Sequence, residues 1–417
     1  MTHLPSAPRR PASPVPVPHD VWIHDGPALL EGVDDGPSLA AHRERYGDLP
    51  QLRLPDLQHL VGRVGLRGRG GAAFPFATKL EAAATRRRPV VVVNLSEGEP
   101  ASAKDSALAL ARPHLVLDGA VATARALGAR ELHLVLSGER PQVRRSIVQA
   151  LGERHDGLDV HDHDAAPRFV AGQARAVIEL MSGRPNLPVT AWVPEAIEGH
   201  RGRPTLLSNA ETWAHVGLLA LRGEVAYRHH GTAQEPGTTL LTLTRPGELP
   251  HVHEVAYGTR LRDVLPEDAR GLPALVGGFH GSWATWPTVA SARVSVARMR
   301  ELGTPLGAGV VLTPDADTCP VELSSRIVDF LAAQSAGRCG PCRNGLPSLA
   351  AALRAVLHGT GGPDRVAELA GLVSGRGACA HPDGTVRLVR SLLAVMPHEV
   401  AAHAAGGCAA LGRAEAS

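Results

Sequence analysis

The sequence predicts an α/β domain with a mostly parallel sheet, then a small mixed α and β unit, then a helical C-terminal region. Three observations predict this order. Apolar strand patterns alternate with helical patterns up to about residue 230, two strand patterns joined by a Pro-Gly turn follow from residue 236, and helical patterns alone follow residue 319. Alternating strands and helices are typical of a parallel sheet covered by helices.

The α/β domain is expected over residues 51–230. The continuous apolar run PVVVVNLS at 89–96 is typical of a strand buried on both faces of a parallel sheet. Pro113 suits the first turn of a helix that follows. Further strands are expected at 131–137 and 158–163, and helices at 54–66, 76–87, 113–129, 141–154 and 169–181.

The second unit is expected over residues 236–312, where two strand patterns flank the turn and a third strand pattern, PALVGGF, follows. The third region is expected over residues 319–410. Its helical patterns cover 321–336, 346–359, 364–375, 385–396 and 398–405. The proline-rich residues 1–50 show little periodicity, and we expect an arm that is disordered in part.

The composition restricts the classes of function. The 417 residues carry a formal net charge of +2 and only 3% aromatic side chains, which argues against nucleic-acid binding. No apolar run approaches the roughly 18 residues of a membrane-spanning helix, and the N-terminus lacks the apolar core of an export signal. We therefore expect a cytoplasmic protein, in which the five cysteines are metal ligands or free thiols and not disulfides.

The most unusual stretch is a glycine-rich loop, since four of the seven residues 65–71 are glycine. No strand precedes the loop, as a standard dinucleotide fold would require. A glycine-rich loop at a helix N-terminus suits a phosphate, or a flat ring that approaches the backbone closely, and Arg67, Arg69 and Lys79 add positive charge. The alternative is a tight turn packed under a sheet.

Four motifs, in order, resemble the flavoprotein subunit of respiratory complex I and the diaphorase subunits of NAD-linked hydrogenases and formate dehydrogenases. The resemblance covers about residues 55–400. The motifs are 65-GLRGRGGAAFP-75 followed by Lys79, 94-NLSEGEPASAKD-105, 202-GRPTLLSNAET-212 and 335-SAGRCGPCRNG-345.

This resemblance implies an α/β domain that binds FMN and NAD(H), a β-grasp unit of the soluble-ligand-binding type, and a helical domain with one [4Fe-4S] cluster. Gly68, Gly70 and Gly71 would form the flavin cradle. Lys79 and Asn94 would contact the flavin.

The resemblance also implies roles for residues around the cradle. Asn209 and Thr212 would hold the ribityl phosphate tail. Phe74 and Glu97 would line the place where the nicotinamide stacks on the flavin. Gly172 would be the first residue of the cofactor-binding turn 172-GQARAV-177.

Two departures from the family concern the nucleotide. Ser96 replaces the aspartate of the family's N-A-D-E motif, and Gln173 and Ala174 replace two carboxylates that help to bind NADH. Carboxylates are natural acceptors for ribose hydroxyls. Their loss predicts weaker NADH binding or a changed donor, and Arg175 could favour the 2′-phosphate of NADPH or could be a solvated helix residue.

A third departure concerns the cluster, which normally takes four thiolates. Ala336 stands where the family has its first cysteine, which leaves Cys339, Cys342 and Cys379. The fourth ligand would be Cys319, since antiparallel packing of the following helix could return it to the cluster, or else Cys408. A structural zinc site is the alternative use of these cysteines.

The resemblance therefore implies an NADH dehydrogenase-like subunit that oxidises NAD(P)H through FMN and passes electrons to a cluster and then to a ferredoxin-like or other iron–sulfur protein. Such a subunit would work in a hetero-oligomer, in the cytoplasm or on the cytoplasmic face of a membrane complex, without inserting into the membrane. Two alternatives stay open. One is an electron relay that has lost NADH and exchanges electrons with a ferredoxin, and the other is a zinc-stabilised scaffold without redox activity.

Overall fold

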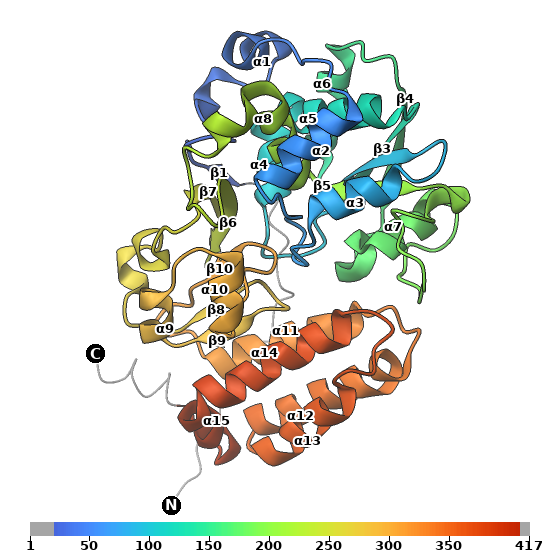
Figure 1. Cartoon of the computed structure of the whole chain (residues 1–417). Helices are drawn as coiled ribbons and strands as arrows, with labels where there is room; N and C mark the ends of the chain where they lie inside the picture. Colours follow the sequence, from blue (N-terminus) through green and yellow to red (C-terminus); the bar gives the residue numbers. More distant parts are fainter. Residues whose placement is uncertain (1–20, 409–417) are drawn as a thin grey trace, which may run out of the picture.

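The computed structural model describes residues 21–408, and Figure 1 shows its three parts. A four-stranded sheet with its helices occupies the upper right, a six-stranded sheet lies at the left centre, and helices α11 to α15 form the lower part. The four-stranded sheet is parallel throughout, in the order β4-β3-β2-β5. Its strands are β2 (Val90–Leu95), β3 (Glu131–Ser137), β4 (Asp159–Ala165) and β5 (Thr205–Asn209).

The central strand β2 is buried on both faces, as the apolar run predicted, whereas the edge strand β4 is largely exposed. Alternate residues of β2 point to opposite faces, so Val91 and Val93 enter the main core, whereas Val90 and Val92 enter a second core with α7. The helices are α2 (Leu54–Arg63), α3 (Phe76–Ala83), α4 (Lys104–Ala111), α5 (Pro113–Leu127), α6 (Pro141–Gly152), α7 (Ala174–Met181) and α8 (Ala210–Tyr227).

Helices α5 and α8 cross very closely, because glycine stands at the crossing on both of them. A Cβ at Gly119 would lie 1.9 Å from the Trp213 carbonyl oxygen, and a Cβ at Gly217 would lie 2.4 Å from the Leu115 carbonyl oxygen. The Trp213 indole N–H donates to the Val92 carbonyl at 3.0 Å, which fixes α8 against the sheet.

The second sheet is mixed, in the order β1-β7-β6-β10-β8-β9. Its inner strands β6 and β10 are parallel, and β6–β7, β10–β8 and β8–β9 are antiparallel. The elements are β6 (Thr238–Thr244), β7 (His251–Ala256), η4 (Leu261–Asp263), η5 (Glu267–Ala269), β8 (Ala274–Val276), β9 (Ser282–Ala284), α9 (Trp286–Ser291), α10 (Val296–Glu301) and β10 (Val310–Leu312).

The C-terminal region is helical, as predicted, and packs against the second sheet around Phe279 and Trp283. The Trp283 indole N–H donates to the Ser324 hydroxyl at 2.8 Å. The elements are α11 (Pro320–Ala333), the π-helical turn η6 (Pro341–Gly345), α12 (Leu346–Leu357), α13 (Pro363–Val373), α14 (His381–Val395) and α15 (Pro397–Ala404).

The N-terminal arm is ordered from residue 21 onward, while residues 1–20 lie outside the described residues. Strand β1 (Trp22–Ile23) pairs with β7, and the segment also contains η1 (Val33–Asp35) and α1 (Leu39–Tyr46). The buried Glu254 carboxylate accepts the N–H groups of Leu29 and Leu30 at 2.8 and 3.0 Å. Sequence periodicity could not reveal this anchor, because its acceptor lies more than 220 residues away.

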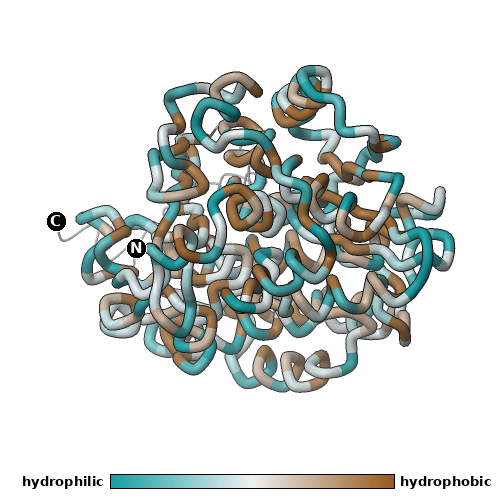
Figure 2. Tube along the Cα trace, turned by 45° about the horizontal axis from the view of Figure 1, so that its top comes forward, coloured by the Kyte–Doolittle hydropathy of each residue, from teal (hydrophilic) through white to brown (hydrophobic). Residues whose placement is uncertain are grey.

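Hydrophilic and hydrophobic positions alternate along the helices in Figure 2. Within residues 21–408, no helix combines the length and the apolar character that would be needed to cross a membrane.

Candidate flavin and iron–sulfur site

The glycine-rich loop closes through a 2.8 Å hydrogen bond from the Gly68 N–H to the Phe74 carbonyl. Gly71 has a φ of 97°, a conformation that favours glycine. Gly70 has no positive φ, and no protein atom lies within 4 Å of the position that a Cβ would take. The protein's own packing therefore does not require glycine at position 70, whereas a ligand lying against the backbone would. This open cradle fits the expected flavin.

The predicted polar residues meet at the carboxyl ends of two adjacent strands. Asn94 lies near the end of β2, Asn209 ends β5, and the two are register partners. The Thr212 hydroxyl donates to Asn209 Oδ1 at 2.6 Å, and Lys79 Nζ donates to the Leu207 carbonyl at 3.2 Å. The chain leaves β2 toward β3 on one side and β5 lies on the other, so this edge is a topological switch point, where open α/β sheets bind ligands.

The glycine loop is joined to the edge of the sheet by Arg69, whose N–H donates to the Thr212 hydroxyl at 2.9 Å. The buried Arg69 guanidinium donates to the Tyr257 hydroxyl and, at 3.1 Å, to the Thr238 carbonyl of the second sheet. Glu211 lies 3.8 Å from it. The loop is therefore held in place by buried charge, while Gly70 stays exposed.

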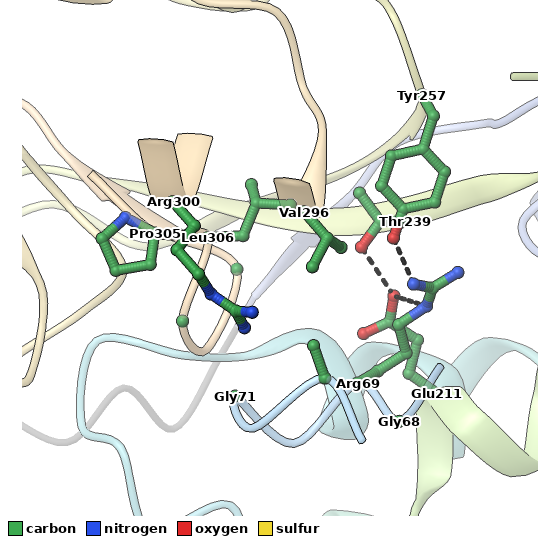
Figure 3. Close-up of a pocket in the computed structure, with 13 residues that line it drawn as sticks. Gly68, Arg69, Gly71, Glu211, Thr239, Tyr257, Val296, Arg300, Pro305 and Leu306 are labelled. Carbon is green, nitrogen blue, oxygen red and sulfur yellow. Dashed lines mark hydrogen bonds and ion pairs between the residues drawn. The ribbon is translucent and has the colours of Figure 1, made fainter. Parts of the chain in front are cut away.

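A small cavity lies between this loop and the second sheet, with Gly68 and Gly71 on one side and Val296 and Arg300 of α10 on the other (Figure 3). Its volume of about 40 Å³ is room for little more than a water molecule. A flavin cannot occupy this cavity, so the exposed face of the loop is the one available to it.

Glu97 corrects an expectation. Its side chain is only 2% exposed, and its carboxylate accepts the N–H groups of Asp105 and Ser106 at 2.9 and 3.0 Å and the Ser102 hydroxyl at 3.0 Å. Arg140 forms an ion pair with the same carboxylate. Glu97 thus satisfies the free N–H groups at the start of α4 and does not present its carboxylate to a nicotinamide. Its backbone, with a φ of 38°, still shapes the turn after β2.

Phe74 lies on the glycine-rich loop and is accessible, so its proposed role beside the nicotinamide stays a prediction. Its side chain is 46% exposed on the same loop as the cradle, so its ring is available for stacking.

Lys104, one of only two lysines, is buried inside the protein and not in the cradle. Its Nζ lies 3.1 Å from an Asp105 oxygen and 3.0 Å from a Glu211 oxygen. Burial opposes its charge, but the two carboxylates outweigh burial and raise the pKa of Lys104. Glu211 also accepts the Leu240 N–H of β6 at 2.9 Å, so this ionic group joins the first sheet to the second.

The segment after β4 connects the polar edge to the cysteines. The Asn94 amide donates to the Gly172 carbonyl at 2.8 Å, and a Cβ at Gly172 would lie 2.5 Å from the Ser96 hydroxyl oxygen. Burial raises the pKa of the Cys379 thiol, and the nearby Gln173 side chain partly opposes that rise. Gly172 therefore positions Asn94, and the residue that follows it lies near the cysteine site.

Three of the predicted cluster ligands lie in one neighbourhood. Cys339, Cys342 and Cys379 lie close enough to interact electrostatically, but their sulfurs are not all within 4.8 Å of one another. Burial raises the pKa of Cys342 to about 11. Cys342 lies in the π-helical turn η6, a rare element that is frequent at functional sites. Three thiols on two loops fit an iron–sulfur cluster.

Cys319 is not the fourth ligand of this cluster. It precedes α11, whereas the Cys339 loop follows the other end of the same helix. Fourteen residues of α-helix span about 21 Å, too far for both sulfurs to reach one cluster. Packing of α11 against its neighbours does not return position 319, and Cys408 contacts Glu399 of α15 instead of the Cys339 loop.

The contacts of Phe169 were not predicted from the sequence. Its ring packs edge-on against Phe330 and against His280. Its N–H donates to the Gln334 side chain at 3.3 Å. An apolar residue at the start of the helical pattern 169–181 carries no signal for such a contact, because its partners belong to distant parts of the chain.

Comparison with known proteins agrees with this geometry. Residues 61–218 match the model of the Nuo51 FMN-binding domain, and residues 322–403 match the NADH-ubiquinone oxidoreductase-F iron–sulfur binding region. One of the NADH-quinone oxidoreductase F-subunits of Rhizobium meliloti, the F 2 form, is 30% identical over 90% of this chain and 97% of its own length. The chain belongs to the family of NADH-quinone oxidoreductase F-subunits.

Other members of this family are similarly related. The NADH-quinone oxidoreductase F-subunit of Escherichia coli is 28% identical over 83% of each chain. A chain of the NAD+-reducing [NiFe]-hydrogenase in the air-oxidized state aligns with a TM-score of 0.81 and 25% identity, over 91% of this chain and 67% of that one. The family resemblance predicted from the four motifs is thereby confirmed.

Proposed function

We propose that this member of the family is an electron-transfer oxidoreductase subunit, which oxidises a reduced nicotinamide dinucleotide with FMN and exports electrons through an iron–sulfur cluster. The observation that carries the proposal is the connection from Asn94 to the turn Phe169–Gly172, and from Phe169 to Gln334, which follows α11 shortly before Cys339. It supports a flavin site and a cysteine site that are close to each other, in the two matched regions of the family.

When bound, FMN accepts a hydride from the nicotinamide and an iron–sulfur cluster carries single electrons. The residues of this chain supply orientation and charge. The exposed backbone at Gly70 gives a flat ring room to approach, and Lys79 places a cation at the same edge. Asn94 and Asn209 offer amide groups at the strand ends. Cys339, Cys342 and Cys379 would hold the cluster, and Phe169 packs against Phe330 and His280 between the two sites.

The domain division proposed for this function follows the predicted boundaries. Residues 51–230 would hold FMN and NAD(H), and residues 319–410 would hold the cluster. Residues 236–312 would form a β-grasp unit of the soluble-ligand-binding type, supported by the mixed sheet with parallel inner strands β6 and β10. The partner would be a ferredoxin-like or other iron–sulfur protein in a hetero-oligomer at the cytoplasmic face of a membrane complex.

A second candidate function is an electron relay without NADH, and the replacement of the two turn carboxylates by Gln173 and Ala174 favours it. An anaerobic titration of the purified protein separates the two. If NADH or NADPH bleaches the flavin absorbance and the cluster signal then appears in EPR, the protein is a dehydrogenase subunit. If dithionite or reduced ferredoxin alone reduces flavin and cluster, the relay function holds and the proposal of nucleotide oxidation is wrong.

Gln173→Glu sharpens the titration, because it restores one carboxylate of the family turn. We expect tighter NADH binding, and an unchanged NADPH affinity would show that the gain comes from the ribose hydroxyls. Gln51→Glu, a substitution of an exposed glutamine, adds the same charge far from the turn and serves as the control. Iron content must be measured in both variants, since Gln173 lies near Cys379.

A further inference from the structure

The described part of the chain contains a second group of cysteines, remote from the Cys339 loop. Cys319 precedes α11, Glu399 and His403 lie on α15, and Cys408 follows that helix. One potential ligand atom from each residue lies within 4.8 Å of the other three. Cys319 Sγ is 3.0 Å from His403 Nε2, His403 Nε2 is 3.7 Å from Glu399 Oε1, and Cys408 Sγ is 3.6 Å from the same Glu399 oxygen.

We propose that these four side chains bind one zinc ion in a closed structural site that is independent of the iron–sulfur cluster. Zinc takes thiolate, imidazole and carboxylate ligands in a tetrahedron, with bonds of about 2.3 Å to sulfur and about 2.0–2.1 Å to nitrogen. The atoms of such a tetrahedron lie about 3.3–3.8 Å apart. The observed separations require only small side-chain movements to reach these values.

The imidazole is already oriented for a metal. His403 Nδ1 lies 3.1 Å from the Leu357 carbonyl oxygen, which can only accept a hydrogen bond. In the neutral ring the proton therefore sits on Nδ1, and Nε2 turns its lone pair toward Cys319 Sγ. Metal-binding histidines are commonly held in this way by a second hydrogen bond to a carbonyl. Cys319 Sγ also accepts the Glu322 N–H at 3.4 Å.

Burial and position favour a structural role. Cys319, Glu399 and His403 are each at most 8% exposed, so the four ligands leave no open position for a substrate. The site would join the start of α11 to α15 and to the residue that follows it. The family's iron–sulfur region, residues 322–403, begins after Cys319 and ends before Cys408, so neither cysteine belongs to it.

The experiment measures zinc and iron in the full-length protein by mass spectrometry of the metals, with X-ray absorption at the zinc edge. We expect about one zinc per chain, with two sulfur ligands and two nitrogen or oxygen ligands. Cys408→Ser and His403→Gln should each lower zinc at least fivefold and leave iron unchanged. Cys379→Ser is the matched control and should lower iron while zinc stays at one.

Three results would overturn the proposal. The first is less than about 0.1 zinc per chain after expression with added zinc. The second is zinc that persists in the double variant Cys408→Ser/His403→Gln. The third is an intact protein mass about two hydrogens below the mass calculated for free thiols, together with loss of this difference in Cys408→Ser. That result would show a disulfide between Cys319 and Cys408. Cys408 lies outside any helix, so its serine variant tests the site even if changes at Cys319 prevent folding.

Discussion

Replacing Glu99 with glutamine should change how the stability of the protein depends on pH. The carboxylate lies between the turn after β2 and the second sheet, where it accepts the Phe279 N–H at 2.9 Å and the Ala101 N–H at 3.2 Å. Burial raises its pKa from 4.5 to about 7, and these two hydrogen bonds only partly oppose the rise. Glycine at position 278 leaves room for the Glu99 carboxylate, since a Cβ at Gly278 would lie 2.6 Å from a Glu99 oxygen.

The sign and size follow from that pKa. The folded state holds the Glu99 proton more tightly than the unfolded state. The contribution of Glu99 to stability is therefore fully present below pH 4.5 and is lost as the pH rises to about 7. A rise of 2.5 units, from 4.5 to about 7, corresponds to about 3 kcal/mol. Glutamine cannot ionise and keeps an acceptor for Phe279. It loses the second acceptor, which should destabilise the variant by about 1 kcal/mol at low pH.

Thermal unfolding by calorimetry from pH 5 to pH 8 tests this prediction. The Glu99→Gln variant should be less stable than the parent at pH 5 and more stable at pH 8. Glu44→Gln removes an exposed carboxylate of α1 and should follow the parent at every pH. If the curves of parent and Glu99→Gln run parallel, the carboxylate is already ionised at pH 5 and the reasoning from burial is wrong.

Three further predictions concern the two sites. Gly70→Ala should weaken FMN binding at least tenfold, measured by fluorescence of released flavin, and should leave the melting temperature unchanged. Gly62→Ala, at an exposed position of α2, is the control. It should leave FMN affinity unchanged and stabilise α2 by about 0.5–1 kcal/mol. Lys104→Met should destabilise the protein by about 3–5 kcal/mol in denaturant unfolding, because it leaves buried carboxylates unpaired, and a loss below about 1 kcal/mol would contradict the ionic group. Ala336→Cys should slow the loss of cluster absorbance to a chelator, since it adds a fourth thiol three residues before Cys339. An unchanged rate would show that position 336 does not reach the cluster.

The sequence was sufficient for the elements whose signal is local. The apolar run at 89–96 is a strand buried on both faces, and the C-terminal patterns are helices α11 to α15. The ordered structure of the N-terminal arm from residue 21 onward could not be predicted in this way. Its Leu29 and Leu30 are held by Glu254, a carboxylate far along the chain. Such a contact leaves no periodic pattern of residue types in the sequence, so only the folded chain shows it.

The sequence by itself determined the family, because four short continuous motifs carry it, and it located the glycine-rich loop, the polar strand ends and the three cysteines proposed for the cluster. Only the tertiary structure decided which side chains meet. It turned the Glu97 carboxylate inward to the start of α4, and it placed Cys319 beside His403 at the far end of α11 from Cys339. The physical reason is that a motif fixes residue types and spacing along the chain, whereas the direction of a side chain and the distance across a rigid helix depend on packing.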